Sequence, residues 1–330
     1  MADNSGVLII VETKEGSPTP ASLELLAFGN ALSQESKQPL YASVFGSADS
    51  STSEGIATMV DRVYAVENPS FDEFDLESCL QAITQVVQIS SPAILLLSAS
   101  LESKDLAPRL ALRLDTGVVN NCEELRVDIE TGVIEALCSV FGGAALSTYR
   151  FDDARPCIVS MAPGVAQPIN LSRDGLGETI SVSPEIVETP RRAKVVDRIS
   201  SAGPRLEESE VIVAGGKGLS ASENFLYIQE LADVLGGMSA ASRAIVDLGW
   251  ATPAQQVGLA GKVVTPNLYL AIGISGASQH MVGCSSARNI VAVNRDEDAP
   301  IFQHARYGVV ADCLEFLPAF IEKCRQLGTA

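Results

Sequence analysis

Residues 268–283 read LYLAIGISGASQHMVG, and residues 290–294 (IVAVN) follow shortly after them. Each stretch contains an apolar run of β-strand length. The first run leads into Ser275 and Gly276, and the glycine lets a ligand approach the backbone closely. A helix predicted to start after Gly276 adds partial positive charge, which suits a phosphate group. This stretch therefore predicts strand, anion-binding loop, short helix and second strand.

His280 follows Gln279 on that predicted helix and is one of two histidines in the chain. A lone histidine beside an apolar helix is more often a structural residue than a cofactor contact. The Ser-Gly loop and the glutamine just before it favour a ligand contact here.

A second strand–loop–helix pattern begins the C-terminal half of the chain. The apolar run Glu210–Ala214 ends in GGKG at residues 215–218, and a helical pattern follows at Ser222–Leu235 with Ser220 or Ser222 as its cap. Such a loop either binds an anion or simply makes a tight turn, and both alternatives stay open.

Apolar runs alternate with helical patterns through the first 114 residues, which predicts a parallel sheet with helices on both faces. The strand runs are Val7–Val11, Tyr41–Phe45, Val63–Val66 and Ala93–Ser98, and the helical patterns are Ser22–Gln34, Ser53–Val60, Leu76–Val87 and Leu106–Leu114.

After Asp115 the pattern changes to short strands joined by glycine turns. Cys122–Ile129, Val133–Val140 and Ala144–Arg150 predict an antiparallel meander added to the sheet, within about residues 122–150. Cys157–Met161 and Ile180–Val187 are further predicted strands.

The length of 330 residues favours two domains. A stretch rich in proline, glycine and basic residues lies at Thr189–Pro204, and we place the boundary there, giving domains 1–199 and 200–330. Its cluster of Arg191, Arg192, Lys194 and Arg198 is interpreted as a solvated linker face.

Composition excludes several classes of protein. A net charge of −18 disfavours nucleic acid and anionic membrane surfaces as partners. No apolar run approaches the roughly 18 residues of a membrane span, and no targeting signal is read at the N-terminus, so we expect a cytoplasmic location. The seven cysteines are irregularly spaced, which predicts reduced thiols and no metal site.

Residues 268–294 resemble the FAD signature of the α subunit of electron transfer flavoproteins. The resemblance continues through DEDAPIFQ at 296–303 and YGVVAD at 307–312, whereas the N-terminal half fits only the family's strand–helix order. It implies an α/β fold of two doubly wound parallel-sheet domains, the C-terminal one flavodoxin-like and holding FAD. It also implies a heterodimer with a β subunit, in which the β subunit often holds AMP.

The resemblance further implies which residues contact the cofactor. Ser242 and Arg243 are expected at its phosphate and isoalloxazine regions, with Arg243 and His280 favouring the one-electron reduced form. Asn294 and Asp312 are expected at the adenosine end. The complete expected set is Lys217, Ser242, Arg243, Gln256, Gly258, Gly261, Ser275, Gly276, Gln279, His280, Asn294 and Asp312.

The sequence also departs from the family pattern. Leu259 and Ala260 stand where relatives usually have a glutamine and a threonine whose hydroxyl is directed at the flavin N5. Lys217 stands in the glycine loop where relatives have an arginine, so the positive charge is kept but the planar guanidinium is lost. His304 and Arg306 lie where different residues are expected, and we have no account of either.

The resemblance implies an electron carrier without substrate chemistry or catalytic residues of its own. It would take electrons from dehydrogenases, of the acyl-CoA type used in fatty acid β-oxidation, and pass them to a quinone oxidoreductase or another acceptor. A cofactor-free assembly subunit is one alternative. A nicotinamide-dependent oxidoreductase is another, but it requires GxGxxG after the first strand, and residues 11–16 lack it.

Overall fold

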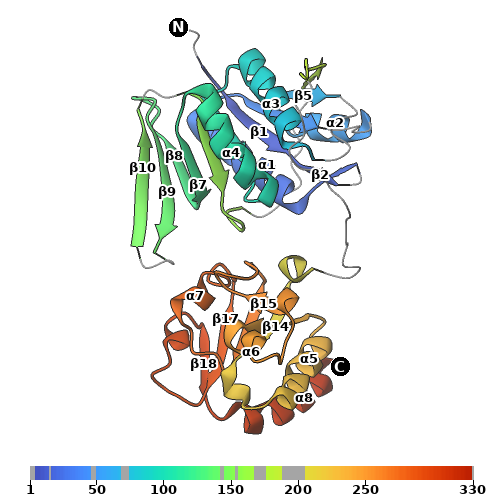
Figure 1. Ribbon diagram of the computed structural model, residues 1–330, viewed down its shortest axis with the longest axis vertical. Helices are drawn as coiled ribbons and strands as arrows, with labels where there is room; N and C mark the ends of the chain where they lie inside the picture. Colours follow the sequence, from blue (N-terminus) through green and yellow to red (C-terminus); the bar gives the residue numbers. More distant parts are fainter. Residues whose placement is uncertain are drawn as a thin grey trace. The chain divides into compact units, whose positions relative to one another are not determined.

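The computed structural model describes residues 4–14, 16–45, 50–67, 74–141, 145–152, 155–166, 176–187 and 205–328. The chain divides into two compact units, one built mostly of residues before 197 and one mostly of residues from 197 on (Figure 1). The domain boundary expected near residue 200, with its basic cluster, lies outside the described residues and stays a prediction.

The N-terminal unit contains a seven-stranded sheet in the order β12-β5-β4-β1-β6-β11-β7, and every neighbouring pair is parallel. Its strands are β1 (Val7–Val11), β4 (Leu40–Phe45), β5 (Arg62–Val66), β6 (Ile94–Leu97), β7 (Val118–Cys122), β11 (Cys157–Met161) and β12 (Glu178–Val182). A small hairpin of β2 (Thr13–Lys14) and β3 (Ser17–Pro18) follows β1.

Four helices cover the two faces of this sheet: α1 (Pro20–Ser36), α2 (Ser50–Ala57), α3 (Leu76–Ser90) and α4 (Leu101–Leu114). Successive strand residues point to opposite faces, so Ile9 packs in one core with α1 and α2 while Leu8 packs in the other with α3 and α4. The predicted parallel sheet with helices on both faces is confirmed.

The antiparallel segment differs from its prediction. Strands β8 (Glu124–Val127), β9 (Ile134–Val140) and β10 (Ala145–Phe151) form a separate three-stranded sheet and do not extend the parallel one. Cys122 instead ends β7, which pairs with β11. Asn121, inside β7, has a left-handed φ of 56°, and the pairing of β7 with β11 shifts register at this point.

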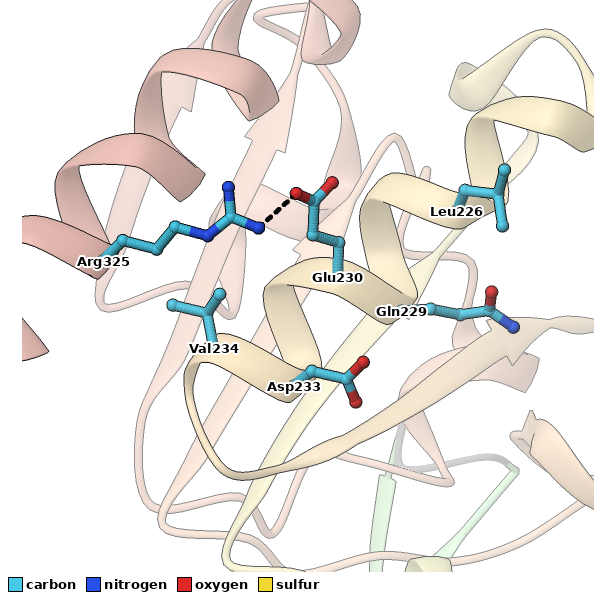
Figure 2. Close-up of a pocket in the computed structure, with 6 residues that line it drawn as sticks. All are labelled: Leu226, Gln229, Glu230, Asp233, Val234 and Arg325. Atoms are coloured by element: carbon cyan, nitrogen blue, oxygen red, sulfur yellow. Dashed lines mark hydrogen bonds and ion pairs between the residues drawn. The ribbon is translucent and has the colours of Figure 1, made fainter.

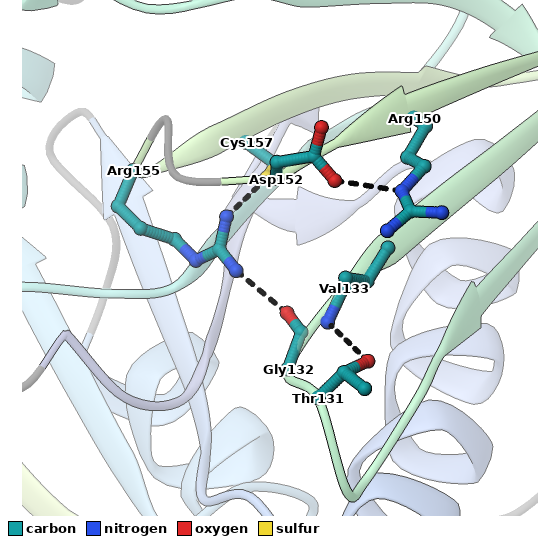
Figure 3. A network of polar contacts seen from close by, with 7 residues as sticks. All are labelled: Thr131, Gly132, Val133, Arg150, Asp152, Arg155 and Cys157. Atoms are coloured by element: carbon teal, nitrogen blue, oxygen red, sulfur yellow. Dashed lines mark hydrogen bonds and ion pairs between the residues drawn. The ribbon is translucent and has the colours of Figure 1, made fainter.

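The turn between β8 and β9 is tied to the start of β11 (Figure 3). The guanidinium of Arg155 donates to the carbonyl of Gly132 at 2.6 Å and to Sγ of Cys157 at 3.4 Å. Arg150 and Asp152 form an exposed ion pair at the end of β10.

The strand predicted at Ile180–Val187 ends earlier, at Val182. The backbone of Glu185 and Val187 bonds instead to the side-chain amides of Gln85 and Gln81 on α3. Because these amides satisfy the backbone groups, the chain leaves the sheet there.

The C-terminal unit contains a six-stranded sheet in the order β15-β14-β13-β16-β17-β18, again with every pair parallel. Its strands are β13 (Val211–Gly215), β14 (Met238–Ser242), β15 (Gln256–Val257), β16 (Leu268–Ile272), β17 (Ile290–Asn294) and β18 (Tyr307–Val310).

Helices α5 (Phe225–Val234), α6 (Arg243–Asp247) and α8 (Cys313–Gly328) pack in the core on one face of this sheet. The short helix α7 (Ser278–Met281) packs in the core on the other face. Neither Ser220 nor Ser222 caps α5, because Ser220 has a φ of 65° and a 3-10 turn occupies Ser222–Asn224.

The described cysteines are free thiols, as predicted, and all but Cys324 are buried. Among the helices that the structure describes, none combines the length and apolar character that crossing a membrane requires.

Candidate functional site

The predicted site residues follow the carboxyl ends of the C-terminal strands. Because all six strands are parallel, these ends meet at one edge of the sheet. Strand by strand, the edge carries Gln256, Gly258 and Gly261 at β15, Ser242 and Arg243 at β14, and Lys217 after β13. It continues with Ser275, Gly276, Gln279 and His280 after β16, Asn294 at β17 and Asp312 after β18. Five gaps between strands, of about 4.8 Å each, make this edge about 24 Å long.

The order of the strands reverses between β13 and β16. In chain order the sheet reads 3-2-1-4-5-6, the order of doubly wound sheets that bind dinucleotides in the crevice at the reversal. Lys217 follows β13 and Ser275 follows β16, so the two residues flank this point. Lys217 is exposed and makes no ion pair with the described chain.

The loop after β16 carries unused hydrogen-bond donors. The backbone N–H groups of Ser275, Gly276 and Ala277 donate to no described residue, although the carbonyl of Ser275 accepts from Ile301 N–H at 3.0 Å. Gly276 has a φ of 82°, and a Cβ there would lie 2.3 Å from the Ile301 nitrogen. The sequence thus requires glycine here for close approach, and three consecutive donors are left for an anion.

The GGKG loop after β13 behaves differently. Its Gly216 and Gly218 N–H groups donate to the carbonyls of Ile272 and Gly273, each at 2.9 Å. A Cβ on Gly216 would lie 2.4 Å from the Gly273 oxygen. Of the two alternatives left open by the sequence, the structure favours the tight turn: these glycines pack two loops together, and Lys217 supplies the charge.

The loop after β15 closes onto α7. Leu259 N–H donates to the carbonyl of Gln279 at 2.7 Å, and a Cβ on Gly258 would lie 2.7 Å from that same oxygen. A Cβ on Gly261 would likewise lie 2.4 Å from the Gln256 backbone oxygen. At both glycines the neighbouring backbone is therefore too close for any side chain. The structure brings Gln256 and Gln279 to one end of the edge, while the Leu259 side chain is 66% exposed.

Ser242 and Arg243 lie where β14 passes into α6. Ser242 is buried, and its hydroxyl makes no hydrogen bond within the described chain. Arg243 is exposed and pairs with Asp247 at 3.3 Å. An exposed pair of this kind contributes little to stability, so the guanidinium is readily given up to a ligand.

His280 is buried against the strand that precedes it. Its Nε2 lies 3.0 Å from the hydroxyl of Tyr269, and its Nδ1 is buried without a hydrogen bond of normal geometry, although the Val257 backbone lies close enough to the ring to oppose the lowering of its pKa. Burial lowers the pKa of His280 to about 4, so the ring is neutral at pH 7. Sequence reasoning missed Tyr269, although its place in an apolar strand marks it as inward-facing.

Asn294 and Asp312 are already engaged in the chain's own turns. The Asn294 amide donates to the Ile274 carbonyl at 2.9 Å, and its oxygen accepts from Asp296 N–H at 3.0 Å. One oxygen of Asp312 accepts from Leu314 N–H at 2.8 Å in the first turn of α8, and its other oxygen makes no bond within the described chain. Asp312 therefore retains more capacity for a ligand than Asn294 does.

A recess of about 390 Å³ lies elsewhere, between α5 and α8 (Figure 2). Glu230 and Arg325 form an ion pair across it at 2.5 Å. Asp233 and Arg325 lie near the carboxyl ends of their helices, which is the end of the unit opposite the strands' carboxyl edge. None of the predicted site residues lines it, so we assign it no role.

Across the described ranges, no group of three or more His, Cys, Asp or Glu side chains is placed to hold a metal ion.

Two family models match the chain. One, described as "Electron transfer flavoprotein domain", matches residues 7–189, and the other, "Electron transfer flavoprotein FAD-binding domain", matches residues 205–285. All predicted cofactor residues except Asn294 and Asp312 lie within the second match.

Similar proteins align over nearly the whole chain. The electron transfer flavoprotein subunit alpha of Thermoanaerobacterium thermosaccharolyticum is 36% identical, covering 99% of this chain and 100% of its own. Protein FixB of Clostridium saccharobutylicum is 35% identical, covering 100% and 99%. Protein FixB of Azorhizobium caulinodans is 37% identical, covering 97% and 88%.

Proposed function

Since the chain belongs to the electron transfer flavoprotein family, as an α subunit, we propose that its C-terminal unit holds FAD along the carboxyl edge of the six-stranded sheet. FAD when bound supplies reversible one- and two-electron chemistry, which the side chains of this chain do not. The role of the chain is to bind the cofactor, orient it and set its electrostatic surroundings.

The pyrophosphate is assigned to the point where the strand order reverses. The free N–H groups of Ser275, Gly276 and Ala277 and the ammonium of Lys217 are the donors there. These three unused donors are the observation that carries the proposal, since no neighbouring group of the described chain satisfies them.

The isoalloxazine ring is assigned to the β15 end of the edge, beside Ser242, Arg243, Gln256, Gln279 and His280. The hydroxyl of Ser242 makes no hydrogen bond within the described chain and the Arg243 guanidinium is exposed, so both are available to a polar ligand. Asp312 and Asn294, toward the other end of the edge, are assigned to the adenosine.

We further propose that the chain pairs with a β subunit and acts as a carrier without substrate chemistry of its own. It would accept electrons from a dehydrogenase, of the acyl-CoA type, and pass them to a quinone oxidoreductase or another acceptor. We also propose that the β subunit of this pair holds AMP. The full names of the α-subunit relatives support a paired assembly.

The test is to purify the chain with the subunit encoded beside it, record the visible spectrum, and identify the released cofactor. FAD in a one-to-one ratio with the chain supports the proposal, and a colourless stable complex contradicts it. Bleaching of the flavin by an acyl-CoA dehydrogenase and its substrate supports the donor class. Bleaching by NADH alone would indicate a nicotinamide-dependent oxidoreductase instead.

A further inference from the structure

The N-terminal sheet has its own reversal of strand order, between β1 and β6. Strands β4 and β5 continue on one side of β1, and β6, which follows them in the chain, lies on the other. In doubly wound sheets this is where a phosphate meets a helix N-terminus. Glu12 directly follows β1 and Ser98 directly follows β6, so both lie at this point.

One carboxylate oxygen of Glu12 accepts hydrogen bonds from three serine hydroxyls of this region. Its Oε1 accepts from Ser98 at 2.8 Å, Ser100 at 2.6 Å and Ser103 at 2.8 Å. Ser100 is the N-cap of the 14-residue helix α4, and Ser103 lies in its first turn. The Ser100 distance is that of a charge-assisted bond, and the helix dipole favours a negative charge in this place.

The backbone of Glu12 is fixed independently of its carboxylate. Its N–H donates to the Ser22 hydroxyl at 2.8 Å, and its carbonyl accepts from Thr19 N–H at 2.9 Å. Ser98 and Ser103 are 4% and 1% exposed, so their hydroxyls depend on a partner within the protein. The carboxylate is thus held in position and satisfies donors that water reaches poorly.

We propose that Glu12 is a built-in anionic ligand that takes the place of a phosphate group at the reversal point of the N-terminal sheet. The unit is closed to nucleotides because this carboxylate already holds the three serine hydroxyls at the start of α4, and its negative charge repels a phosphate. The C-terminal unit shows the opposite arrangement at its own reversal point, where three N–H donors are unused and Lys217 adds positive charge. Glu12 therefore determines which of the two similarly folded units binds a nucleotide cofactor.

The experiment compares Glu12→Ala with Glu102→Ala in the full chain saturated with FAD. Glu102 lies in the first turn of α4 but is exposed and makes no hydrogen bond within the described chain, so its removal takes away the same charge without freeing the serines. Melting temperatures are measured in phosphate and in chloride of equal ionic strength. Any phosphate site in the C-terminal unit is common to all variants and cancels.

Glu12→Ala is expected to melt below the wild type in chloride. Phosphate at ten times its dissociation constant is expected to raise the melting temperature of Glu12→Ala by about 3 °C more than that of the wild type or Glu102→Ala. Adding Ser98→Ala to Glu12→Ala is expected to abolish this extra rise.

Three results would overturn the proposal. They are an equal phosphate response in all three proteins, an extra rise that survives Ser98→Ala, and a Glu12→Ala chain that folds in neither salt. The last counts because phosphate should replace the missing carboxylate.

Discussion

The hydroxyl of Tyr269 lies 3.0 Å from Nε2 of His280, and both side chains are buried. Tyr269 belongs to β16 and His280 to α7, so the bond ties the short helix to the sheet. Burial raises the pKa of Tyr269 well above its usual value, lowers that of His280 to about 4 and raises that of Cys284 to about 12. The cluster is therefore uncharged at neutral pH, and it fixes the ring of His280, which the proposed function places beside the flavin.

Replacing Tyr269 by Phe removes one partner of this bond and leaves Nε2 buried without another. The expected loss in the free energy of unfolding is about 1–3 kcal/mol, measured by urea denaturation. Tyr307→Phe is the control, because Tyr307 is exposed and its hydroxyl makes no hydrogen bond within the described chain; its effect should stay within about 0.5 kcal/mol. Equal stability of the two variants would contradict the assigned bond.

His280 should make the protein less stable as the pH falls. Its pKa is lower in the folded chain, about 4, than the ordinary 6.5, so the unfolded chain binds more protons between these values. The stability it contributes is complete above pH 6.5 and is lost as the pH falls toward 4. At pH 5 the loss relative to pH 7.5 is about 2 kcal/mol.

Urea denaturation at the two pH values measures this effect. His280→Gln should lack that part of the pH dependence, whereas His304→Gln, at the other and exposed histidine, should keep all of it. A wild type and His280→Gln with the same pH dependence would show that the ring is not buried as described.

Gly276→Ala should destabilise the chain more than Gly236→Ala. Both glycines have positive φ, 82° and 65°, so each substitution costs about 1–2 kcal/mol of backbone strain. Only at Gly276 does a Cβ also meet backbone, 2.3 Å from the Ile301 nitrogen, whereas nothing lies within 4 Å at Gly236. We also expect loss of FAD from Gly276→Ala alone of the two. Equal melting temperatures and equal flavin contents would contradict the described loop.

Ala260→Thr should restore the hydroxyl that relatives carry near the flavin N5. A hydrogen bond worth about 1.4 kcal/mol to the one-electron reduced form would raise the first reduction potential by about 59 mV, measured by spectroelectrochemistry. Ala260→Val has the same shape without the hydroxyl and should leave the potential nearly unchanged. Identical potentials for the Thr and Val variants would place residue 260 away from N5.

Local patterns were sufficient to predict much of the fold. The strand and helix runs before Leu114 and the strand–loop–helix around Ser275 were readable because apolar spacing records which face is buried. What sequence could not show are non-local pairings. The left-handed Asn121 lies inside β7, where the pairing with β11 shifts register, and the amides of Gln81 and Gln85 hold residues 185–187 out of the sheet. Both features depend on packing between distant segments.

The candidate site shows the same division. Its residues were predicted from the resemblance, and the parallel topology places them on one edge. The sequence could not show which glycine loop keeps free N–H donors. Both GGKG and SGAS supply such donors, and only the folded chain shows whether a carbonyl from another segment lies close enough to accept from them. The N–H groups of Gly216 and Gly218 donate to the carbonyls of Ile272 and Gly273. The N–H groups of Ser275 and Gly276 find no acceptor within the described chain.

Amide hydrogen exchange of the full chain, with and without FAD, tests the central claim most directly. The amides of residues 275–277 have no partner in the described chain, so they should exchange rapidly without FAD and become protected when it binds. The amides of Gly216 and Gly218 serve as internal controls and should be protected in both states. Protection that arises in the N-terminal unit, with residues 275–277 unchanged, would contradict the account.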